Sequence, residues 1–257
     1  MNILKKYRWA FLIPLVLIFA FAFTIGQKPI TFASTAAILY LIGWLFAYQK
    51  ARWLIIFVLS LVPISLIQIL QQISKHFTVY STMTFFFILI TCGILTFVLA
   101  KRWQIIEKPT KKSFPIGKIL LGFLFIFIAS YLSNLIGGFF HTTETTQNQT
   151  ALDSLSQQIP MIVFGAQVIT AGFFEEITYR ASIFELIFKK YPIIAYIAAA
   201  LIFTIMHGPT DIYSWLTYGS MSLVLTSFYA KYRNIYLNMS IHILWNTFGF
   251  ILAFLIK

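Results

Sequence analysis

Long apolar runs separated by short polar breaks repeat along the whole chain, and this pattern constrains its fold more than any other feature. A bilayer core of about 30 Å is crossed by roughly 20 apolar residues in a helix. Backbone groups in lipid must also form their hydrogen bonds within their own segment. We therefore predict an all-α fold, a polytopic helical membrane protein with about eight or nine transmembrane helices. The nine runs cover residues 9–25, 30–48, 53–73, 79–100, 116–140, 160–187, 191–207, 212–230 and 234–256. The count falls to eight if one early run only lies at the interface.

The amino-acid composition supports a lipid-solvated chain. Hydrophobic residues make up 60% of it and charged residues 10%, which is too little polar surface to cover a water-soluble globule of this length. A formal net charge of +12 could indicate nucleic-acid binding. The Lys and Arg residues, however, lie in short clusters between apolar runs, where they set membrane orientation. We expect membrane lipids as partners and no nucleic acid.

The distribution of basic residues predicts the orientation in the cell membrane. If the N-terminus is cytoplasmic, only Lys28, Lys75 and Lys257 face outward and Arg180 lies within a span. This asymmetry follows the positive-inside rule and supports the nine-span interpretation. The predicted cytoplasmic residues are Lys5, Lys6, Arg8, Lys50, Arg52, Lys101, Arg102, Lys108, Lys111, Lys112, Lys118, Lys189, Lys190, Lys231 and Arg233.

Two polar segments divide the chain. Residues 101–118 contain several lysines and two prolines, which predicts the longest cytoplasmic linker. Residues 141–158 are rich in Thr and Gln without a basic residue, and we expect the longest external loop there. We predict generic N-terminal transmembrane helices over residues 1–115 and a functional core over residues 116–257, within one integral membrane domain.

Ionisable residues concentrate in the later runs. A charged side chain at the centre of a bilayer costs roughly 2.5 to 3.5 kcal/mol on insertion scales, so such residues mark candidate functional sites. The later runs contain Glu175, Glu176, Arg180, His207 and His242, together with the amides Asn238 and Asn246.

The segment AGFFEEITYR holds two carboxylates with different surroundings. Glu176 and Arg180 are four residues apart and share a helix face, so a structural ion pair explains both. Glu175 points about 100° away from its neighbour. It is the unpaired carboxylate, and we therefore expect it to be the general base.

The segments FTIMH and HILWN each place a histidine four residues from a second side chain. Phe203 can pack on the ring of His207 and orient it, although a lone histidine at the end of a span is more often an interfacial hydrogen-bonding group. His242 and Asn246 share a face, and contacts between helices would explain them as well. Together with Glu175, these groups could activate a water and stabilise an oxyanion, as peptide hydrolysis requires.

The three segments also carry a family resemblance. EEITYR resembles the EExxxR motif, FTIMH the FxxxH motif and HILWN the HxxxN motif of the CAAX protease and bacteriocin-processing family, also called the Abi or type II CAAX endopeptidase family. The motifs occur in the family's order within about residues 160–250. One departure is Ala181, where many members have glycine. The resemblance implies that Glu176 and Arg180 organise the site.

The same resemblance implies intramembrane proteolysis of a peptide or membrane-protein substrate. Glu175 with His207 would activate the water, and His242 with Asn246 would hold the oxyanion. Processing of a bacteriocin or leader peptide, or self-immunity, is a further hypothesis that the resemblance suggests.

The sequence leaves the use of a metal open. Glu175, His207 and His242 match the His₂Glu ligand set of catalytic zinc sites, although no HExxH helix is present. A metalloprotease and a glutamate-dependent protease would use the same residues.

In straight helices the three candidate catalytic side chains would lie at different depths in the membrane. Counted from the cytoplasmic basic clusters, Glu175, His207 and His242 differ in depth by roughly 12 Å. We expect a break after Arg180, with residues 182–190 lying along the interface as an amphipathic helix.

Two other functions fit the same ionisable residues. A proton- or ion-coupled transporter could use them as a relay, but the sequence has no internal repeat of the kind found in many transporters. A non-catalytic immunity or scaffold protein would have no need for carboxylate and imidazole groups in lipid. The intramembrane endopeptidase is therefore the preferred interpretation.

Overall fold

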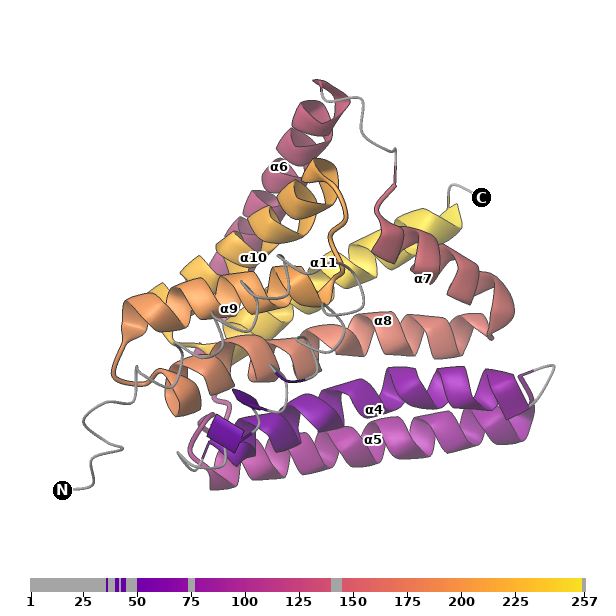
Figure 1. Cartoon of the computed structure of the whole chain (residues 1–257), viewed down its shortest axis with the longest axis horizontal. Coiled ribbons are helices and arrows are strands. Elements are labelled where there is room, and N and C mark those ends of the chain that lie inside the picture. The colour runs from indigo at the N-terminus through magenta and orange to yellow at the C-terminus, as the bar shows by residue number, and fades with distance from the viewer. Residues whose placement is uncertain are drawn as a thin grey trace. The chain divides into compact units, whose positions relative to one another are not determined.

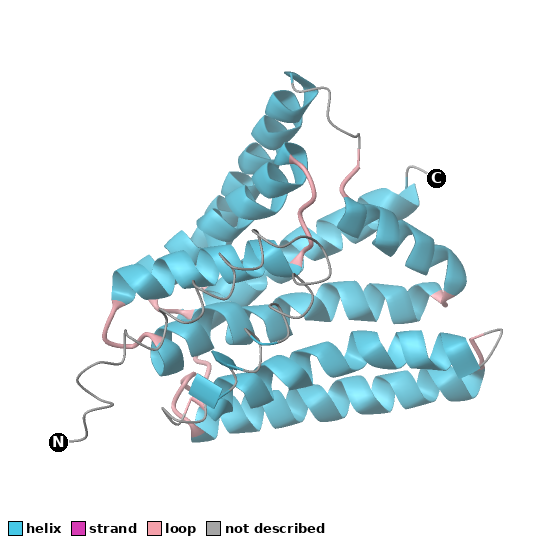
Figure 2. Ribbon diagram, in the orientation of Figure 1, coloured by secondary structure: helices cyan, strands magenta, loops and turns pink. Residues whose placement is uncertain are grey.

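Every regular element in the described part of the chain is a helix (Figure 2). The computed structural model describes residues 36, 40–41, 43–44, 50–73, 77–139 and 145–255. The chain divides into two compact units, residues 1–55 and 56–257, and the second contains the candidate site and every helix named below except the first residues of α4. The predicted span 9–25 lies outside the described residues, and the span 30–48 lies almost wholly outside them.

Each of the seven later apolar runs forms a helix, as predicted. Among the described residues, five helical segments are long and apolar enough to cross a membrane; α9 is apolar but shorter, and the helix over the predicted span 212–230 is not among the five. Over the described residues this confirms a polytopic all-α membrane protein. The helices are α4 (Ala51–Ile73), α5 (Val79–Arg102), α6 (Ile116–Phe139), α8 (Met161–Glu175), α9 (Pro192–Met206), α10 (Ile212–Tyr232) and α11 (Ile235–Leu255).

The ends of α10 show how local sequence limits the helices. Asp211 caps its first turn by accepting a hydrogen bond from the Ser214 backbone N–H at 2.7 Å, and the Ser214 hydroxyl oxygen accepts one from the Asp211 N–H at 3.0 Å. This reciprocal arrangement is a capping box. At the other end Arg233 adopts a left-handed conformation with φ 47°, which stops the helix and turns the chain into α11.

The segment predicted as an external loop contains a helix, so that interpretation was incomplete. Helix α7 (Gln147–Gln158) begins after Thr146, whose hydroxyl oxygen accepts a hydrogen bond from the Gln149 N–H at 3.1 Å. Thr146 and Gln149 form the Ser/Thr-x-x-Glu/Gln pattern typical of a helix start. The helix is polar, and its composition concealed it.

The expected break after Arg180 does not occur. Two π-helical segments, η3 (Glu176–Ala181) and η4 (Ile183–Ile187), continue α8, and Ser182 between them keeps helical angles of φ −68° and ψ −38°. Ile183 and Phe184 are buried, so this stretch packs into the protein instead of lying at the interface. The wider π turn, which is frequent at functional sites, accommodates the polar residues without a break.

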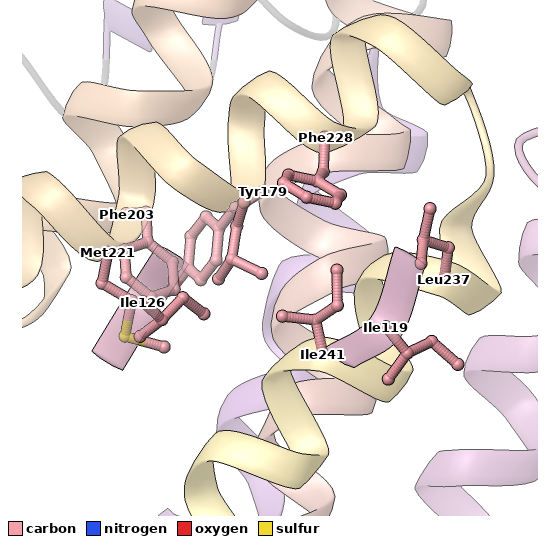
Figure 3. Packing of buried hydrophobic residues seen from close by; sticks show 9 residues of the cluster. Ile119, Ile126, Tyr179, Phe203, Met221, Phe228, Leu237 and Ile241 are labelled. Carbon is pink, nitrogen blue, oxygen red and sulfur yellow. The ribbon is translucent and has the colours of Figure 1, made fainter. Parts of the chain in front are cut away.

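The helices pack around two hydrophobic clusters. Helix α11 packs against α8 and α6, and α10 packs against α6 and α9. Figure 3 shows the cluster between them, in which the Tyr179 and Phe203 rings meet edge to face at 5.8 Å between centroids. In the second cluster, Phe174 of α8 packs with Phe85 of α5 and Ile67 of α4, and these helices run side by side in Figure 1.

Candidate active site

The end of α8 and the start of η3 place Glu176 and Arg180 in the protein interior. Both side chains are fully buried, and Nη1 of Arg180 lies 2.9 Å from Oε1 of Glu176. The ion pair predicted from their four-residue spacing is therefore confirmed. Since two buried charges are stable only with further hydrogen bonds, the neighbours of each side chain matter.

Glu176 is bound from α11 as well as from its own helix. Nδ1 of His242 lies 2.8 Å from Oε1 of Glu176, and the Asn238 amide donates to Oε2 at 3.1 Å. The same Asn238 amide donates to the Leu225 carbonyl of α10 at 2.7 Å. Both carboxylate oxygens are thus satisfied, and Glu176 fixes His242 in place.

Arg180 extends this network to α10 and α9. Its Nη2 donates to the Ser222 hydroxyl at 3.2 Å, and Ser222 donates to the Ala200 carbonyl at 3.0 Å. The guanidinium carbon lies 4.1 Å from the centroid of the Phe203 ring, a cation–π distance. The guanidinium therefore connects η3 with α10 and α9, and Glu176 connects it to α11.

Glu175 lies at the edge of this network. Its side chain is 24% exposed, and its Oε2 lies 3.8 Å from Nε2 of His242. This oxygen is buried and has no hydrogen-bond partner. The carboxylate predicted to be unpaired therefore lies against the His242 ring. His207, the imidazole that the resemblance pairs with Glu175, makes no ion-pair contact with it in the described part of the chain.

His207 follows the last residue of α9 and is held by other means. Its Nδ1 lies 2.8 Å from the Phe203 carbonyl oxygen. The centroid of the Phe203 ring lies 4.4 Å from that of the imidazole. The Tyr218 ring stacks on the imidazole with a centroid distance of 4.5 Å and an interplanar angle of 26°. The predicted contact between Phe203 and His207 is confirmed.

Asn246 is on α11, one turn beyond His242, and its amide donates to the Val168 carbonyl of α8 at 2.9 Å. This contact is of the kind expected for an amide that joins two helices. Gly172 of α8 faces the same helix, because a Cβ there would lie 3.0 Å from the Ile243 backbone nitrogen. The absence of a side chain at Gly172 allows the close approach that brings His242 to the two glutamates.

The three residues considered as metal ligands do not form a ligand set in this arrangement. Among the described residues, no group of three or more His, Cys, Asp or Glu side chains is positioned to hold one ion. Nδ1 of His242 faces Glu176 and Nδ1 of His207 faces a backbone carbonyl.

Sequence reasoning missed two polar neighbours of the site. Ser222 and Tyr218 both lie on α10, which carried no motif. Their signal is weak, because serine and tyrosine are common in α10. Asn238 was noted as an intramembrane amide, but its partner Glu176 is 62 residues away in sequence.

A buried network of carboxylate, guanidinium and imidazole groups thus lies among apolar helices, next to a carboxylate oxygen without a hydrogen-bond partner. The family of type II CAAX prenyl endopeptidases described as Rce1-like matches residues 157–248, which include all three motifs. The UPF0177 protein YvdC of Lactococcus lactis subsp. lactis (strain IL1403) is 45% identical over 254 residues, covering 99% of this chain and 97% of that protein. No solved structure shows a significant match. The chain belongs to the CAAX protease and bacteriocin-processing family, a family of intramembrane proteases.

Proposed function

We propose that this chain is an intramembrane endopeptidase in which Glu175 and His242 together activate a water molecule. The observation that carries the proposal is the unpartnered Oε2 of Glu175, 3.8 Å from Nε2 of His242. This separation is too long for a direct hydrogen bond. Two acceptors bound to the two hydrogens of one water lie roughly 4.5 Å apart, so these side chains must separate slightly for a water to bridge them.

The orientation of His242 supports its part in this step. Glu176 is paired with Arg180, and an ionised carboxylate only accepts hydrogen bonds. The Nδ1–H group of His242 therefore donates to Glu176, and in the neutral ring Nε2 carries the lone pair toward Glu175. A histidine oriented by a carboxylate on its other nitrogen is a common way of fixing the tautomer.

The proposed reaction uses Glu175 twice. As the water oxygen attacks the peptide carbonyl carbon, Glu175 takes a proton from the water. The tetrahedral intermediate then collapses with cleavage of the C–N bond, and the protonated Glu175 returns that proton to the leaving amine. One Asn246 amide hydrogen is bound to Val168, and we assign the other to the oxyanion. For His207 we retain the role that the resemblance implies, in which its imidazole assists Glu175 in activating the water.

The substrate class that fits best is a peptide segment anchored in or at the membrane. Most of the site residues lie on the segment Met161–Ile187 and on α11, which are long and apolar enough to span a bilayer, and His207 follows the shorter apolar helix α9. The matching family is described as a prenyl endopeptidase, which makes a prenylated C-terminal peptide the first candidate. An unmodified leader peptide, as in bacteriocin maturation, is the second.

The test is cleavage of quenched fluorescent peptides by purified protein in proteoliposomes. One probe set carries a farnesylated C-terminal Cys-aliphatic-aliphatic-X sequence, and the other is an unmodified peptide library. We expect Glu175→Gln to lower kcat by roughly 10² to 10⁴-fold, the usual contribution of a general base. Glu107→Gln, the same change at an exposed glutamate, is the control. A Glu175→Gln protein as active as the control would refute the mechanism.

Metal analysis of the same samples completes this experiment. Activity that persists in wild-type protein containing less than one equivalent of any transition metal supports the carboxylate and imidazole mechanism. Activity that requires a stoichiometric ion would replace it with a metal-dependent one.

A further inference from the structure

His207 is the site residue whose position depends most on aromatic contacts. No carboxylate forms an ion pair with it among the described residues, and its recorded hydrogen bond joins Nδ1 to the Phe203 carbonyl at 2.8 Å. That bond engages only one of the two ring nitrogens. The rings of Phe203 and Tyr218, with centroids 4.4 and 4.5 Å from that of the imidazole, pack against it and limit its other orientations.

Tyr218 is itself held at both ends. Its ring stacks on His207, and its hydroxyl lies 2.8 Å from the Thr146 hydroxyl and accepts a hydrogen bond from the Asn148 amide at 3.1 Å. Because the Asn148 amide is a donor, the tyrosine O–H can donate to Thr146. Tyr218 and Thr146 are both buried, so this contact is shielded from competing water.

The partners of the tyrosine hydroxyl belong to the start of helix α7. Thr146 is the N-cap of that helix and also accepts from the Gln149 N–H at 3.1 Å. The polar helix between α6 and α8 is therefore connected through one tyrosine to the ring of His207. A mispositioned α7 would remove the support of that ring.

From this chain of contacts, we propose that Tyr218 is a positioning residue that holds the His207 imidazole in its working orientation and is itself held by Thr146 and Asn148 of helix α7. The inference rests on the proposed function, in which His207 takes part in peptide hydrolysis. It adds a residue outside the three motifs and gives α7 a part in the site.

Four variants separate positioning from general packing. Tyr218→Phe keeps the stacked ring and loses the hydroxyl bonds, whereas Tyr218→Leu loses both. Tyr213→Leu is the matched control, because it makes the same change on the same helix at a tyrosine whose hydroxyl donates to Asn134 of α6. His207→Gln provides the background in which an effect transmitted through His207 must disappear.

The first measurement is the rate of cleavage of the peptide that wild type cleaves. We expect Tyr218→Leu to lower kcat by roughly 10 to 100-fold with KM nearly unchanged, as for a misaligned reacting group. Tyr218→Phe keeps the stacked ring but loses the bonds to Thr146 and Asn148, so its rate should fall between those of Tyr218→Leu and wild type. Tyr213→Leu should resemble wild type. In the His207→Gln background the Tyr218→Leu change should have little further effect, because residues that act through one another are not additive. An equal loss in both backgrounds overturns the proposal.

The second measurement does not depend on activity. The chain has four histidines, so histidine-labelled protein gives a small set of NMR signals, and His207→Gln identifies the one of interest. An imidazole stacked on an aromatic ring, as His207 is on Tyr218, has upfield-shifted protons. The shift should decrease strongly in Tyr218→Leu and only in part in Tyr218→Phe. An unchanged signal in Tyr218→Leu overturns the proposal, even if wild type cleaves no peptide and the proposed function itself fails.

Discussion

At the scale of single residues, Glu176 is the centre of the polar network. Its two oxygens contact Arg180, His242 and Asn238, so one buried carboxylate coordinates groups from two parts of the sequence. Buried ion pairs of this kind add little net stability, but removing one partner leaves an uncompensated charge. Replacing one charged partner should therefore lower the stability of the protein more than replacing both.

This asymmetry gives a prediction for Arg180. We expect Arg180→Met to lower the free energy of unfolding in mixed micelles by about 3 to 5 kcal/mol, because Glu176 loses its buried counter-ion. The double variant Arg180→Met, Glu176→Gln should recover a substantial part of that loss. Both unfolding free energies are obtained from denaturation curves of the same preparations. A double variant less stable than Arg180→Met alone would contradict this account.

The control for that experiment is a more exposed ion pair among the described residues. Nη1 of Arg233 lies 2.9 Å from Oε1 of Glu185, and their side chains are 44% and 22% exposed. Exposed pairs contribute about 1 kcal/mol or less, so Arg233→Met should cost much less than Arg180→Met. Equal losses of unfolding free energy in Arg180→Met and Arg233→Met would mean that burial does not determine the cost of breaking an ion pair in this protein.

The sequence predicted contacts between residues close along the chain. The pair Glu176 and Arg180 followed from a four-residue spacing, and so did the contact of Phe203 with His207. The approach of Glu175 to His242 could not be predicted in the same way. It depends on how two helices cross, and nothing in the local spacing encodes that geometry.

At the scale of elements, the contact between α8 and α11 determines the site geometry. Two glycines of α8 lie close to α11: Gly165 faces the Phe250 ring, and Gly172 lies against the Ile243 backbone. Between them, the Val168 carbonyl oxygen accepts a hydrogen bond from the Asn246 amide. Small residues at regular intervals allow membrane helices to approach closely. The glutamates and His242 meet at the end of this contact.

Gly172→Ala tests whether the close approach matters. The added methyl would lie 3.0 Å from the Ile243 nitrogen and 3.3 Å from the His242 carbonyl carbon, so α11 must move away. We expect peptide cleavage to fall by at least roughly tenfold, since small misplacements are costly in catalysis.

The matched control for Gly172→Ala is Gly249→Ala on α11, where a Cβ meets nothing within 4 Å. There the change should leave cleavage unaffected and stabilise the helix by about 0.5 to 1 kcal/mol. Cleavage and thermal unfolding of both variants distinguish a local clash from a general effect of alanine. If the two variants behave alike, the close approach at Gly172 has no special role.

Apolar periodicity was sufficient to place the long helices, because in lipid a run of apolar residues has few alternatives to a helix. It failed for α7, whose polar composition resembles that of a loop although Thr146 and Gln149 form a capping pattern. It failed also for η3 and η4, because the choice between an α turn and a π turn depends on the packing of Ile183 and Phe184.

At the scale of the whole molecule, the distribution of charge predicts a cytoplasmic N-terminus, with α7 outside and the segment before α6 inside. The chain has one cysteine, Cys92, so Cys92→Ala provides a background for labelling. We expect a cysteine at Asp153 of α7 to react with a membrane-impermeant maleimide in intact cells. A cysteine at Lys111 should react only after permeabilisation. The opposite pattern would invert the predicted orientation.

The ion pair of Glu176 with Arg180 also affects how the chain enters the membrane during synthesis. The segment Met161–Ile187 leaves the ribosome before Asn238 and His242 have been made, so it must enter the bilayer without its later partners. Because the two opposite charges lie four residues apart in that one segment, it carries its own counter-ion, and each charge is relieved of part of the roughly 2.5 to 3.5 kcal/mol insertion penalty. Glu176 can then bind Asn238 and His242 later, after α11 has been synthesised and inserted.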